Sequence, residues 1–365
     1  MTAHFPAQPE QLTATWLTAT LQASGALTGD TAVTTFEISP VGAGIGLLGL
    51  VMRVHLTYEG SGGSPGPATV VVKFAHPVAE NRAIAMNTRM YEREVGFFND
   101  IASSVDVPKP MCHFAAVDTA TGENIVVLED LGAYRVGDQV LGIDRAGIDL
   151  IIDALIPLHV AFWGRTDGEL LADAMRVDSS YVEPFLPSLL GTWERGVELF
   201  GQAIAPEVLP HVGRYVEAMR GLHHQMGQRT QTLVHGDVRL DNVMFGSGDQ
   251  HPVMLIDWQA IMVSNPMHDI SYLMSQSVEV EVRVTHERAV VERYHAAVCA
   301  AGVTDYPLEQ CWDDYDVGIA FLFSYPLIIA GVCDTDDPRA VQLAEAVLRR
   351  SSQAISDRGL LRLIA

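Results

Sequence analysis

Hydrophobic residues in the first third of the chain recur with the two-residue period of β-strands. Residues 52–58, MRVHLTY, place Met, Val, Leu and Tyr on one face and Arg, His and Thr on the other, which predicts a strand with one buried side. Residues 69–74, TVVVKF, and 124–128, NIVVL, are short runs rich in β-branched side chains and predict two further strands. The segment from Phe36 to Phe74 is therefore predicted to form antiparallel sheet, with the glycine- and proline-rich residues 59–68 as a flexible connection.

Helical patterns dominate the rest of the chain. From about Glu80 to Ser103, one helical face carries the apolar side chains Met90, Tyr91, Phe97, Phe98 and Ile101. After Gly132 the chain is mostly helical, except for one compact stretch from Thr232 to Asp257. This pattern predicts an α+β protein with two lobes: a small β-rich domain over residues 1–131 and a larger, mainly α-helical domain over residues 132–365.

The most apolar segment, residues 317–333, has the sequence VGIAFLFSYPLIIAGVC. It is just short of a membrane span, contains Ser324 and Pro326, and has acidic residues at both ends. These features favour a buried helix bent at Pro326 over a membrane span. The acidic residues border an acceptor site or are solvated helix ends; the sequence leaves both readings open.

The composition is that of a globular protein with a strongly acidic surface. Of the 365 residues, 48% are hydrophobic and 19% are charged, and the formal net charge is -22. No basic stripe is available to neutralise phosphates, so the composition argues against nucleic-acid binding. The acidity either keeps the protein soluble or attracts a cationic substrate.

The cysteines and the N-terminus indicate a reducing compartment. Cys112, Cys299, Cys311 and Cys333 form no CxxC pair and have no zinc-ligand spacing. Residues 1–13 lack the basic and apolar regions of a secretion signal. We therefore expect a cytoplasmic protein.

Lysine is confined to two positions in a chain that otherwise uses arginine. Lys109 lies between prolines in a loop, whereas Lys73 lies in the buried run TVVVKF and needs a partner for its charge. Glu94 has the complementary problem, because it lies on the apolar face of its predicted helix. Pairing the two would satisfy both, either as a purely structural ion pair or as part of a functional site.

A glycine-rich motif precedes the strand predicted at residues 52–58. Gly44, Gly46 and Gly49 form a G-x-G-x-x-G pattern. A dinucleotide-binding site requires a helix after this motif, but the following residues alternate as a strand. The motif therefore fits a hairpin that covers phosphates, or a glycine-rich turn that binds no ligand.

Two further stretches combine short apolar β-type segments with polar residues. They are VHGDVRLDNVMF at residues 234–245 and VMLIDW at residues 253–258. Asp237 and Asn242 lie in the loop between β-type segments, and Asp257 follows the second segment. Carboxylate and amide oxygens are hard ligands that Mg²⁺ accepts while substrate phosphates complete its coordination shell.

Together these motifs resemble the protein-kinase-like fold in its small-molecule branch, which includes aminoglycoside phosphotransferases, choline kinases and ecdysteroid-kinase-like (CHK) proteins. The resemblance covers about Gly42 to Leu273. It implies that Gly44, Gly46 and Gly49 cover the nucleotide phosphates.

The resemblance also implies roles for the other charged residues of the first domain. Lys73, held by Glu94, would contact the α- and β-phosphates. The segment from Glu129 to Leu131 looks like the hinge between the lobes, whose backbone would meet the adenine.

In the second domain, the resemblance implies that Asp237 is the catalytic base for the acceptor hydroxyl. Asn242 and Asp257 would hold Mg²⁺, and Arg239 occupies the position at which many kinases place a lysine that contacts the γ-phosphate. Asp269 matches a buried aspartate that braces the catalytic loop, and we interpret it as structural.

Three departures from protein kinases argue against phosphorylation of proteins. Gly236 follows His235 where the arginine of a phosphorylation-regulated kinase would stand, Asp257-Trp258-Gln259 replaces Asp-Phe-Gly, and only eleven residues separate Asp257 from Asp269. The Asp-Trp-Gln sequence leans toward the ecdysteroid-kinase-like group.

The sequence therefore predicts an ATP-dependent phosphotransferase that acts with Mg²⁺ on a hydroxyl of a small molecule. The alternatives are an aminoglycoside or other amino-alcohol phosphotransferase, and a nucleotide-binding pseudokinase scaffold. The acceptor, the choice between ATP and GTP, and the oligomeric state do not follow from the sequence.

Overall fold

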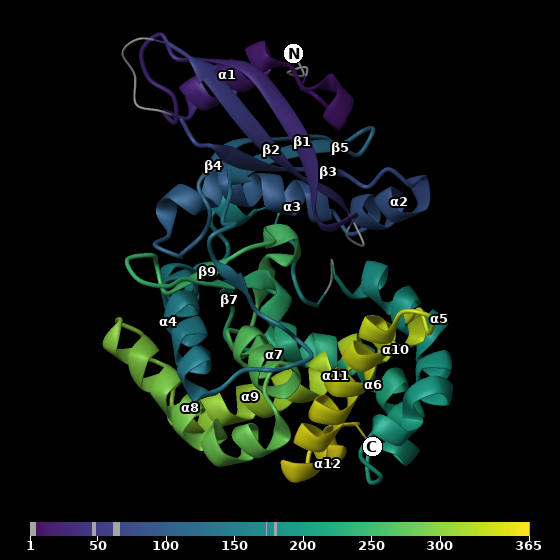
Figure 1. The fold of residues 1–365 in the computed structure, drawn as a ribbon. Helices are drawn as coiled ribbons and strands as arrows, with labels where there is room; N and C mark the ends of the chain where they lie inside the picture. Colours follow the sequence, from purple (N-terminus) through teal and green to yellow (C-terminus); the bar gives the residue numbers. More distant parts are fainter. Residues whose placement is uncertain (1–4, 46–48, 61–65, 173, 179–180, 365) are drawn as a thin grey trace. The chain divides into compact units, whose positions relative to one another are not determined.

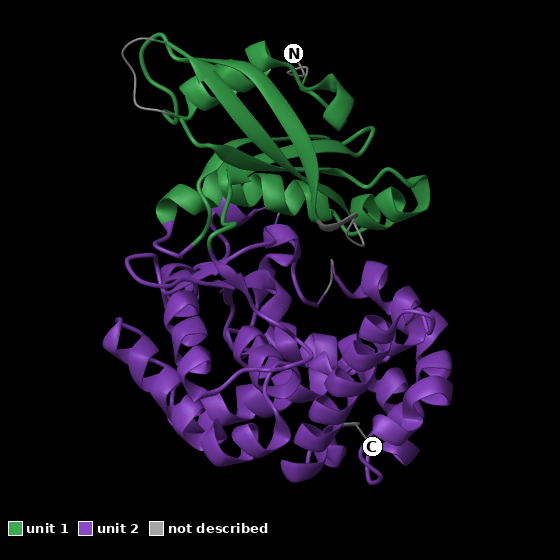
Figure 2. Ribbon diagram, in the orientation of Figure 1, with its two compact units in different colours: residues 1–104, 109–133 green, residues 105–108, 134–365 purple. Residues whose placement is uncertain are grey.

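The computed structural model describes residues 5–45, 49–60, 66–172, 174–178 and 181–364. The chain divides into two compact units (Figure 2). Unit 1 comprises Met1–Ser104 and Lys109–Ala133, and unit 2 comprises Val105–Pro108 and Tyr134–Ala365.

Unit 1 is built on a five-stranded antiparallel sheet with strand order β1-β2-β3-β5-β4. The strands are β1 (Ala32–Ile45), β2 (Gly49–Glu59), β3 (Thr69–Ala75), β4 (Cys112–Asp118) and β5 (Glu123–Glu129). This confirms the predicted antiparallel sheet and the strand at residues 124–128. Strand β4 and the N-terminal helix α1 (Ala14–Ala23) were not predicted from the sequence.

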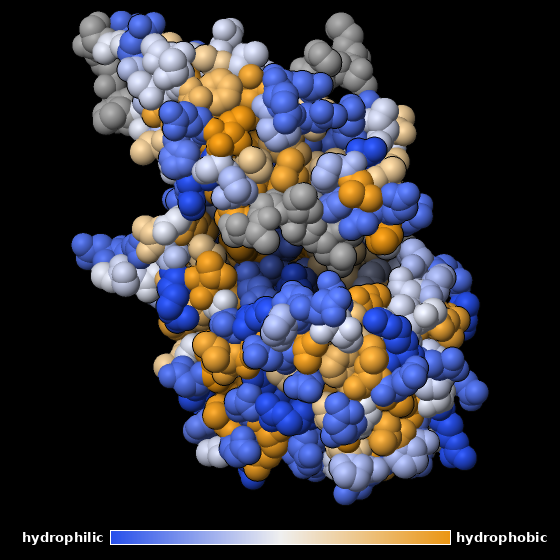
Figure 3. All heavy atoms as spheres, turned by 45° about the vertical axis from the view of Figure 1, so that its right-hand side comes forward, coloured by the Kyte–Doolittle hydropathy of each residue, from blue (hydrophilic) through white to orange (hydrophobic). Residues whose placement is uncertain are grey.

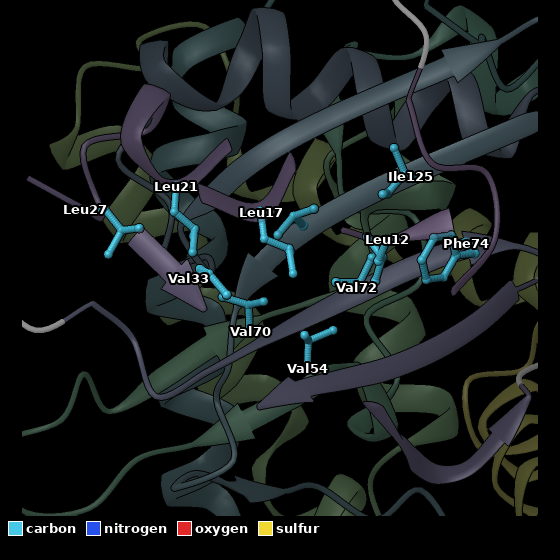
Figure 4. Close-up of a cluster of buried hydrophobic side chains, with 11 residues drawn as sticks. Leu12, Leu17, Leu21, Leu27, Val33, Val54, Val70, Val72, Phe74 and Ile125 are labelled. Carbon is cyan, nitrogen blue, oxygen red and sulfur yellow. The ribbon is translucent and has the colours of Figure 1, made fainter. Parts of the chain in front are cut away.

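The two faces of this sheet pack against different helices. Val70, Val72 and Phe74 of β3 point into a buried cluster with Leu17 and Leu21 of α1 (Figure 4). Because side chains alternate along a strand, Lys73 faces the opposite side. That side is covered by α3 (Met90–Gly96), whose Val95 packs with residues of β4 and β5.

The helical segment after β3 is interrupted, whereas the sequence predicted continuous helix from Glu80 to Ser103. Helix α2 (Ala79–Asn87) ends before Arg89, which has a left-handed backbone with φ of 54°. Helix α3 then runs into a π-helical turn, η2 (Phe97–Ile101), and the 3₁₀ turn η3 (Ala102–Ser104). Both sides of the break still contact the sheet: Ala85 of α2 packs with Ala75 of β3, and Val95 of α3 packs with Val126 of β5.

Unit 2 is mainly helical, as predicted. Its longer helices are α4 (Arg145–Phe162), α5 (Val182–Phe200), α6 (Val212–Gln228), α7 (Met267–Gln276), α8 (Val280–Ala300), α9 (Leu308–Leu322), α10 (Ser324–Val332) and α11 (Pro338–Asp357), followed by the short α12 (Leu361–Ile364). Helix α7 packs against α8, α9 and α11 near the centre of this unit (Figure 1).

Short strands interrupt the helices in the predicted compact stretch. Strand β7 (Thr232–Val234) pairs with β10 (Met262–Ser264), and a second sheet has the order β6-β8-β9. Its strands are β6 (Arg135–Val136), β8 (Val243–Phe245) and β9 (Val253–Leu255). The polar loop predicted to carry the chemistry joins β7 to β8.

The apolar segment around Pro326 forms two helices, α9 and α10, that meet at Phe323. Proline cannot donate a backbone hydrogen bond, and its ring clashes with the carbonyl four residues earlier, here Leu322. The break therefore falls three residues before Pro326 rather than at it. Residues Leu308–Val332 are long and apolar enough to cross a membrane, with a mean hydropathy of 1.6, but 78% of that window is buried within the protein.

Candidate active site

Lys73 and Glu94 form a buried ion pair in unit 1. The Nζ of Lys73 lies 2.6 Å from Oε1 of Glu94, and the two side chains are 13% and 0% exposed. Lys73 is held between β2 and β5, opposite Val51 and Val126, so its side chain can only extend toward α3. The structure thus brings together the two charged residues that the sequence placed in buried elements.

A second contact fixes the helix that carries Glu94. The hydroxyl of Tyr91 accepts a hydrogen bond of 3.0 Å from the backbone N–H of His76, which follows β3. Helix α3 is therefore attached to β3 at two points, one of them the Lys73–Glu94 pair. Such attachment limits the freedom of the Lys73 ammonium group.

The glycine-rich motif joins β1 to β2. Gly44 lies near the end of β1 and Gly49 begins β2, while Gly46 lies outside the described residues. A Cβ atom on Gly49 would lie 3.1 Å from the carbonyl oxygen of Phe74, so a side chain there would crowd β3. The connection between two antiparallel strands excludes the dinucleotide-binding reading, which requires a helix after the glycines.

The predicted hinge contains an ion pair that the sequence analysis missed. Glu129 ends β5 and its carboxylate accepts a 3.1 Å hydrogen bond from the N–H of Met111, while Leu131 is buried. Between them, Asp130 accepts two hydrogen bonds from Arg53 of β2, at 2.5 and 3.0 Å. Burial opposes ionisation of Asp130, but the hydrogen bond from Arg53 helps to lower its pKa.

The loop that joins β7 to β8, residues 235–242, is the predicted catalytic loop, and the buried Asp269 of α7 holds it. Its two carboxylate oxygens accept hydrogen bonds of 2.8 Å from His235 N–H and 2.9 Å from Gly236 N–H. Gly236 has φ of +83°, and a Cβ atom there would lie 2.4 Å from the carbonyl oxygen of Ala260, so only glycine fits. The bracing contacts expected of Asp269 are present.

Asp237 follows this fixed turn and has three polar neighbours. Asn242 donates from Nδ2 to a carboxylate oxygen of Asp237 at 3.0 Å. The Nε of Arg239 lies 3.6 Å from the same oxygen. Tyr272 of α7 lies near Asp237; burial, aided by the negative charge of this carboxylate, raises the pKa of Tyr272 well above its ordinary value. Tyr272 was not among the residues predicted from the sequence.

Pairing of β8 with β9 places Asn242 beside Asp257. Val243 pairs with Leu255, and the N–H of Ile256 donates to the carbonyl oxygen of Asn242 at 3.0 Å. Asp257 itself has φ of 64°, a conformation that aspartate tolerates better than most residues. Because Nδ2 of Asn242 faces Asp237, its Oδ1 is the amide atom that a metal ion could use.

The donor set at this point suits Mg²⁺. One amide oxygen and one carboxylate match an ion that takes few protein ligands and keeps water and phosphate oxygens in its shell. Within the described part of the chain, no group of three or more His, Cys, Asp and Glu side chains is arranged to hold a metal ion. Any metal held here would thus complete its shell with other ligands.

An aromatic cluster adjoins Asp237 through Tyr272. The Tyr272 and Tyr325 rings meet edge to face at 5.6 Å, and the hydroxyls of Tyr325 and Tyr181 lie 3.1 Å apart. Helices α5, α6, α7, α9 and α10 contribute to the aromatic cluster, whose members are Tyr181, Phe185, His223, His268, Tyr272, Phe321 and Tyr325.

Two of the acidic residues in α9 have arginine partners. Asp314 pairs with Arg229 and also accepts from Tyr306 at 3.0 Å, and Asp316 lies 2.7 Å from Arg358. These two carboxylates are buried and paired within unit 2, so they are not the solvated helix ends that the sequence allowed.

Comparison with known proteins places the chain in a family. Residues 44–301 match the model of the ecdysteroid kinase-like family. Short segments are 31% identical over 88 residues to acyl-CoA dehydrogenase family member 10 of Mus musculus, and 33% identical over 86 residues to probable acyl-CoA dehydrogenase IBR3 of Arabidopsis thaliana. These segments cover 24% and 22% of this chain but only 8% and 10% of those much longer proteins.

Solved structures share the fold at low sequence identity. A putative aminoglycoside phosphotransferase from Ralstonia eutropha JMP134 is 16% identical, with a TM-score of 0.54 over 93% of this chain and 97% of that chain. The GDP and kanamycin complex of APH(2")-IIia is 13% identical, with a TM-score of 0.54 over 94% and 99%. A microcompartment-associated aminopropanol kinase is 13% identical, with a TM-score of 0.54 over 96% and 100%.

The family match covers more than half of the chain, and the fold agrees with it. The chain therefore belongs to the ecdysteroid kinase-like family, and it has the same fold as these aminoglycoside phosphotransferase and aminopropanol kinase structures.

Proposed function

We propose that this protein transfers the γ-phosphoryl group of ATP to a hydroxyl of a neutral, largely apolar small molecule, with Asp237 as the base. The observation that carries the proposal is the arrangement around Asp237. Asp269 holds the backbone of the two residues before it, and Asn242, Arg239 and Tyr272 lie near its carboxylate. Such a carboxylate is held ready to orient a hydroxyl group.

The reaction forms one bond and breaks one. The acceptor oxygen attacks the γ-phosphorus, the bond from that phosphorus to the β–γ bridging oxygen breaks, and ADP leaves. The hydroxyl proton passes to a carboxylate oxygen of Asp237. Arg239 would offset negative charge on the transferred group, because its guanidinium lies beside the base.

Donor binding in this proposal uses the residues that the family resemblance indicated. Lys73, held by Glu94, would contact the α- and β-phosphates, and Gly44, Gly46 and Gly49 would cover them. Glu129 and Leu131 would present their backbone to the base of the nucleotide. Asn242 and Asp257 would hold Mg²⁺, which neutralises phosphate charge when bound.

The aromatic cluster supports an apolar acceptor. Tyr272 lies near Asp237, and its ring contacts that of Tyr325, which is half-buried and the most exposed member of the cluster. Because Asp314 and Asp316 already have arginine partners, these carboxylates do not offer a free anionic surface to a polyamine. Apolar rings with a few hydroxyl groups suit a neutral, hydroxylated ligand.

A phosphotransfer screen tests the proposal. Wild-type protein with Mg·ATP or Mg·GTP is offered sterols, simple alcohols, sugars, amino alcohols and aminoglycosides, and phosphorylated product is measured directly. We expect the best acceptor to be neutral, with a KM that barely changes between low and physiological salt, because screening weakens only charged contacts.

Two outcomes would contradict the proposal. An aminoglycoside or amino alcohol whose KM rises steeply with salt, while the nucleotide KM stays constant, would favour the amino-alcohol alternative. Nucleotide binding without transfer to any acceptor, and without ATP hydrolysis, would favour the scaffold alternative.

A further inference from the structure

A buried glutamine outside the predicted machinery contacts the middle of the catalytic loop. Gln139 is 1% exposed and lies in the segment after β6. Its Oε1 accepts hydrogen bonds from the backbone N–H of Leu240 at 2.8 Å and from the Ser277 hydroxyl at 3.0 Å. Its backbone N–H donates to the Asp241 carboxylate at 3.3 Å. Leu240 and Asp241 are the residues between Arg239 and Asn242.

The chain around Gln139 lies directly against the same loop. The N–H of Gly137 donates to the carbonyl oxygen of Val243 at 2.8 Å. A Cβ atom on Gly137 would lie 2.3 Å from the carbonyl oxygen of Leu240, so any side chain there would displace the loop. Residues 137–142 therefore form a brace along the loop from Leu240 to Val243.

Helix α11 holds this brace through a buried arginine. Arg350 is 1% exposed and donates to the carbonyl oxygens of Gln139 at 2.6 Å and Val140 at 2.7 Å. Glu279, at the start of α8, supplies the opposite charge. Arg350 also reaches the carbonyl oxygen of Gln276, to which Nε2 of Gln139 donates at 3.0 Å.

We propose that Gln139 is a positioning residue for catalysis and that Arg350 holds it in place, so that α11 acts on the catalytic loop through Gln139. The Leu240 N–H is buried midway between Asp237 and Asn242, and Gln139 supplies its acceptor. Without that acceptor the loop must move until the N–H finds another partner, since an unpaired buried donor is costly. Movement there changes the spacing between the base and the amide of Asn242.

The first test is Gln139→Leu, which removes the amide at similar volume. The inference rests on the proposed function, so kcat is measured with the best acceptor of the wild type. We expect kcat to fall by about tenfold to a hundredfold, because small misplacement of catalytic groups has effects of that size. The KM values for nucleotide and acceptor should stay within about threefold, since binding groups are not removed. Gln139→Glu keeps an acceptor for Leu240 and should recover part of kcat.

The matched control is Gln310→Leu. Gln310 is a half-buried glutamine whose amide donates to the Thr230 hydroxyl at 3.0 Å, outside the catalytic loop. It should keep the wild-type kcat. If Gln139→Leu does not fold, Arg350→Lys replaces it, because it keeps the charge beside Glu279 but cannot reproduce the several contacts of the guanidinium.

A second readout does not depend on activity. Amide hydrogen exchange should show faster exchange at Leu240 and its neighbours in Gln139→Leu or Arg350→Lys, but not in Gln310→Leu. A folded Gln139→Leu with kcat within twofold of wild type, or with unchanged exchange at Leu240, would overturn the inference. An inactive wild type would instead refute the proposed function, and the exchange measurement would still decide whether Gln139 holds the loop.

Discussion

At the scale of single residues, each buried charge of the Lys73–Glu94 pair is stabilised by the opposite charge beside it. Lys73 and Glu94 are each unfavourable alone in an apolar setting, and the 2.6 Å contact between them resolves both. This pair was predictable, because strand and helix periodicity alone placed each charge on a buried face. The position of Tyr272 was not predictable, because a tyrosine in a helix gives no sign in the sequence that it lies near Asp237.

Replacing Lys73 tests this pair. Lys73→Ala leaves Glu94 buried without the ammonium group, and we expect the free energy of unfolding to fall by about 3 kcal/mol. Turnover should fall by about a hundredfold or more, because a phosphate-contacting charge is lost. The control is Lys109→Ala, since these are the two lysines of the chain. Near-normal turnover in folded Lys73→Ala would remove Lys73 from the nucleotide site.

At the scale of elements, one ion pair ties strand β2 to the segment after β5. Arg53 of β2 reaches Asp130, which also accepts from the N–H of Gly132 at 2.8 Å. The sequence predicted strand β2 and its alternation correctly, but it assigned Arg53 only to the polar face. Contacts between non-neighbouring strands depend on strand order, and nothing in the local pattern shows that β5 lies between β3 and β4.

Other elements were not predicted because their local sequence has no distinctive pattern. Helix α1 covers the sheet, yet it is a short amphipathic segment with little to distinguish it in the sequence. Arg89, whose backbone is left-handed, separates α2 from α3, although no glycine or proline marks a break there in the sequence. By contrast, Pro326 did predict an interruption, with an error of a few residues in its position.

Removing the Arg53–Asp130 pair should affect nucleotide binding more than chemistry. Asp130→Ala frees the backbone at Gly132 and leaves Arg53 without its bidentate partner. We expect nucleotide affinity to fall by about tenfold with kcat nearly unchanged, as measured by calorimetry and kinetics. Glu183→Ala, which breaks an exposed pair with Arg220 in unit 2, serves as the control. Equal nucleotide affinity in the two variants would show that the Arg53–Asp130 pair does not shape the nucleotide site.

For the whole molecule, the net charge of -22 is carried on a mixed surface. On the face drawn in Figure 3, hydrophilic and hydrophobic residues are interspersed over both units. The interior of unit 2, however, holds neutral histidines. Burial lowers the pKa of His223 to about 4, and it also lowers the pKa of His268.

These histidines predict loss of stability in mild acid. The unfolded chain protonates His223 near its ordinary pKa of 6.5, whereas the folded protein resists protonation until about 4. Folding is therefore favoured above pH 6.5, and the contribution is lost as the pH falls toward 4. For His223 alone we expect a loss of about 2 kcal/mol by pH 5.

Thermal unfolding between pH 7.5 and 4.5 measures this effect. In His223→Asn, the amide can replace the ring N–H that donates to the carbonyl oxygen of Val177 at 2.7 Å, but it cannot take up a proton. The variant should lose less stability than the wild type over this range. An identical pH dependence would show that His223 is not a source of acid sensitivity.

The claim that Asp237 is the catalytic base is tested most directly with Asp237→Asn. Nucleotide binding is measured by calorimetric titration with and without Mg²⁺, and product formation is measured on the same sample. If Asp237 is the base, transfer should be abolished while affinity for Mg·ATP stays close to that of the wild type, because the base acts on the acceptor. Asp257→Asn should instead lose the Mg²⁺-dependent part of nucleotide affinity. Asp237→Asn that transfers phosphate at the wild-type rate, or that loses nucleotide affinity as severely as Asp257→Asn, would contradict the assignment.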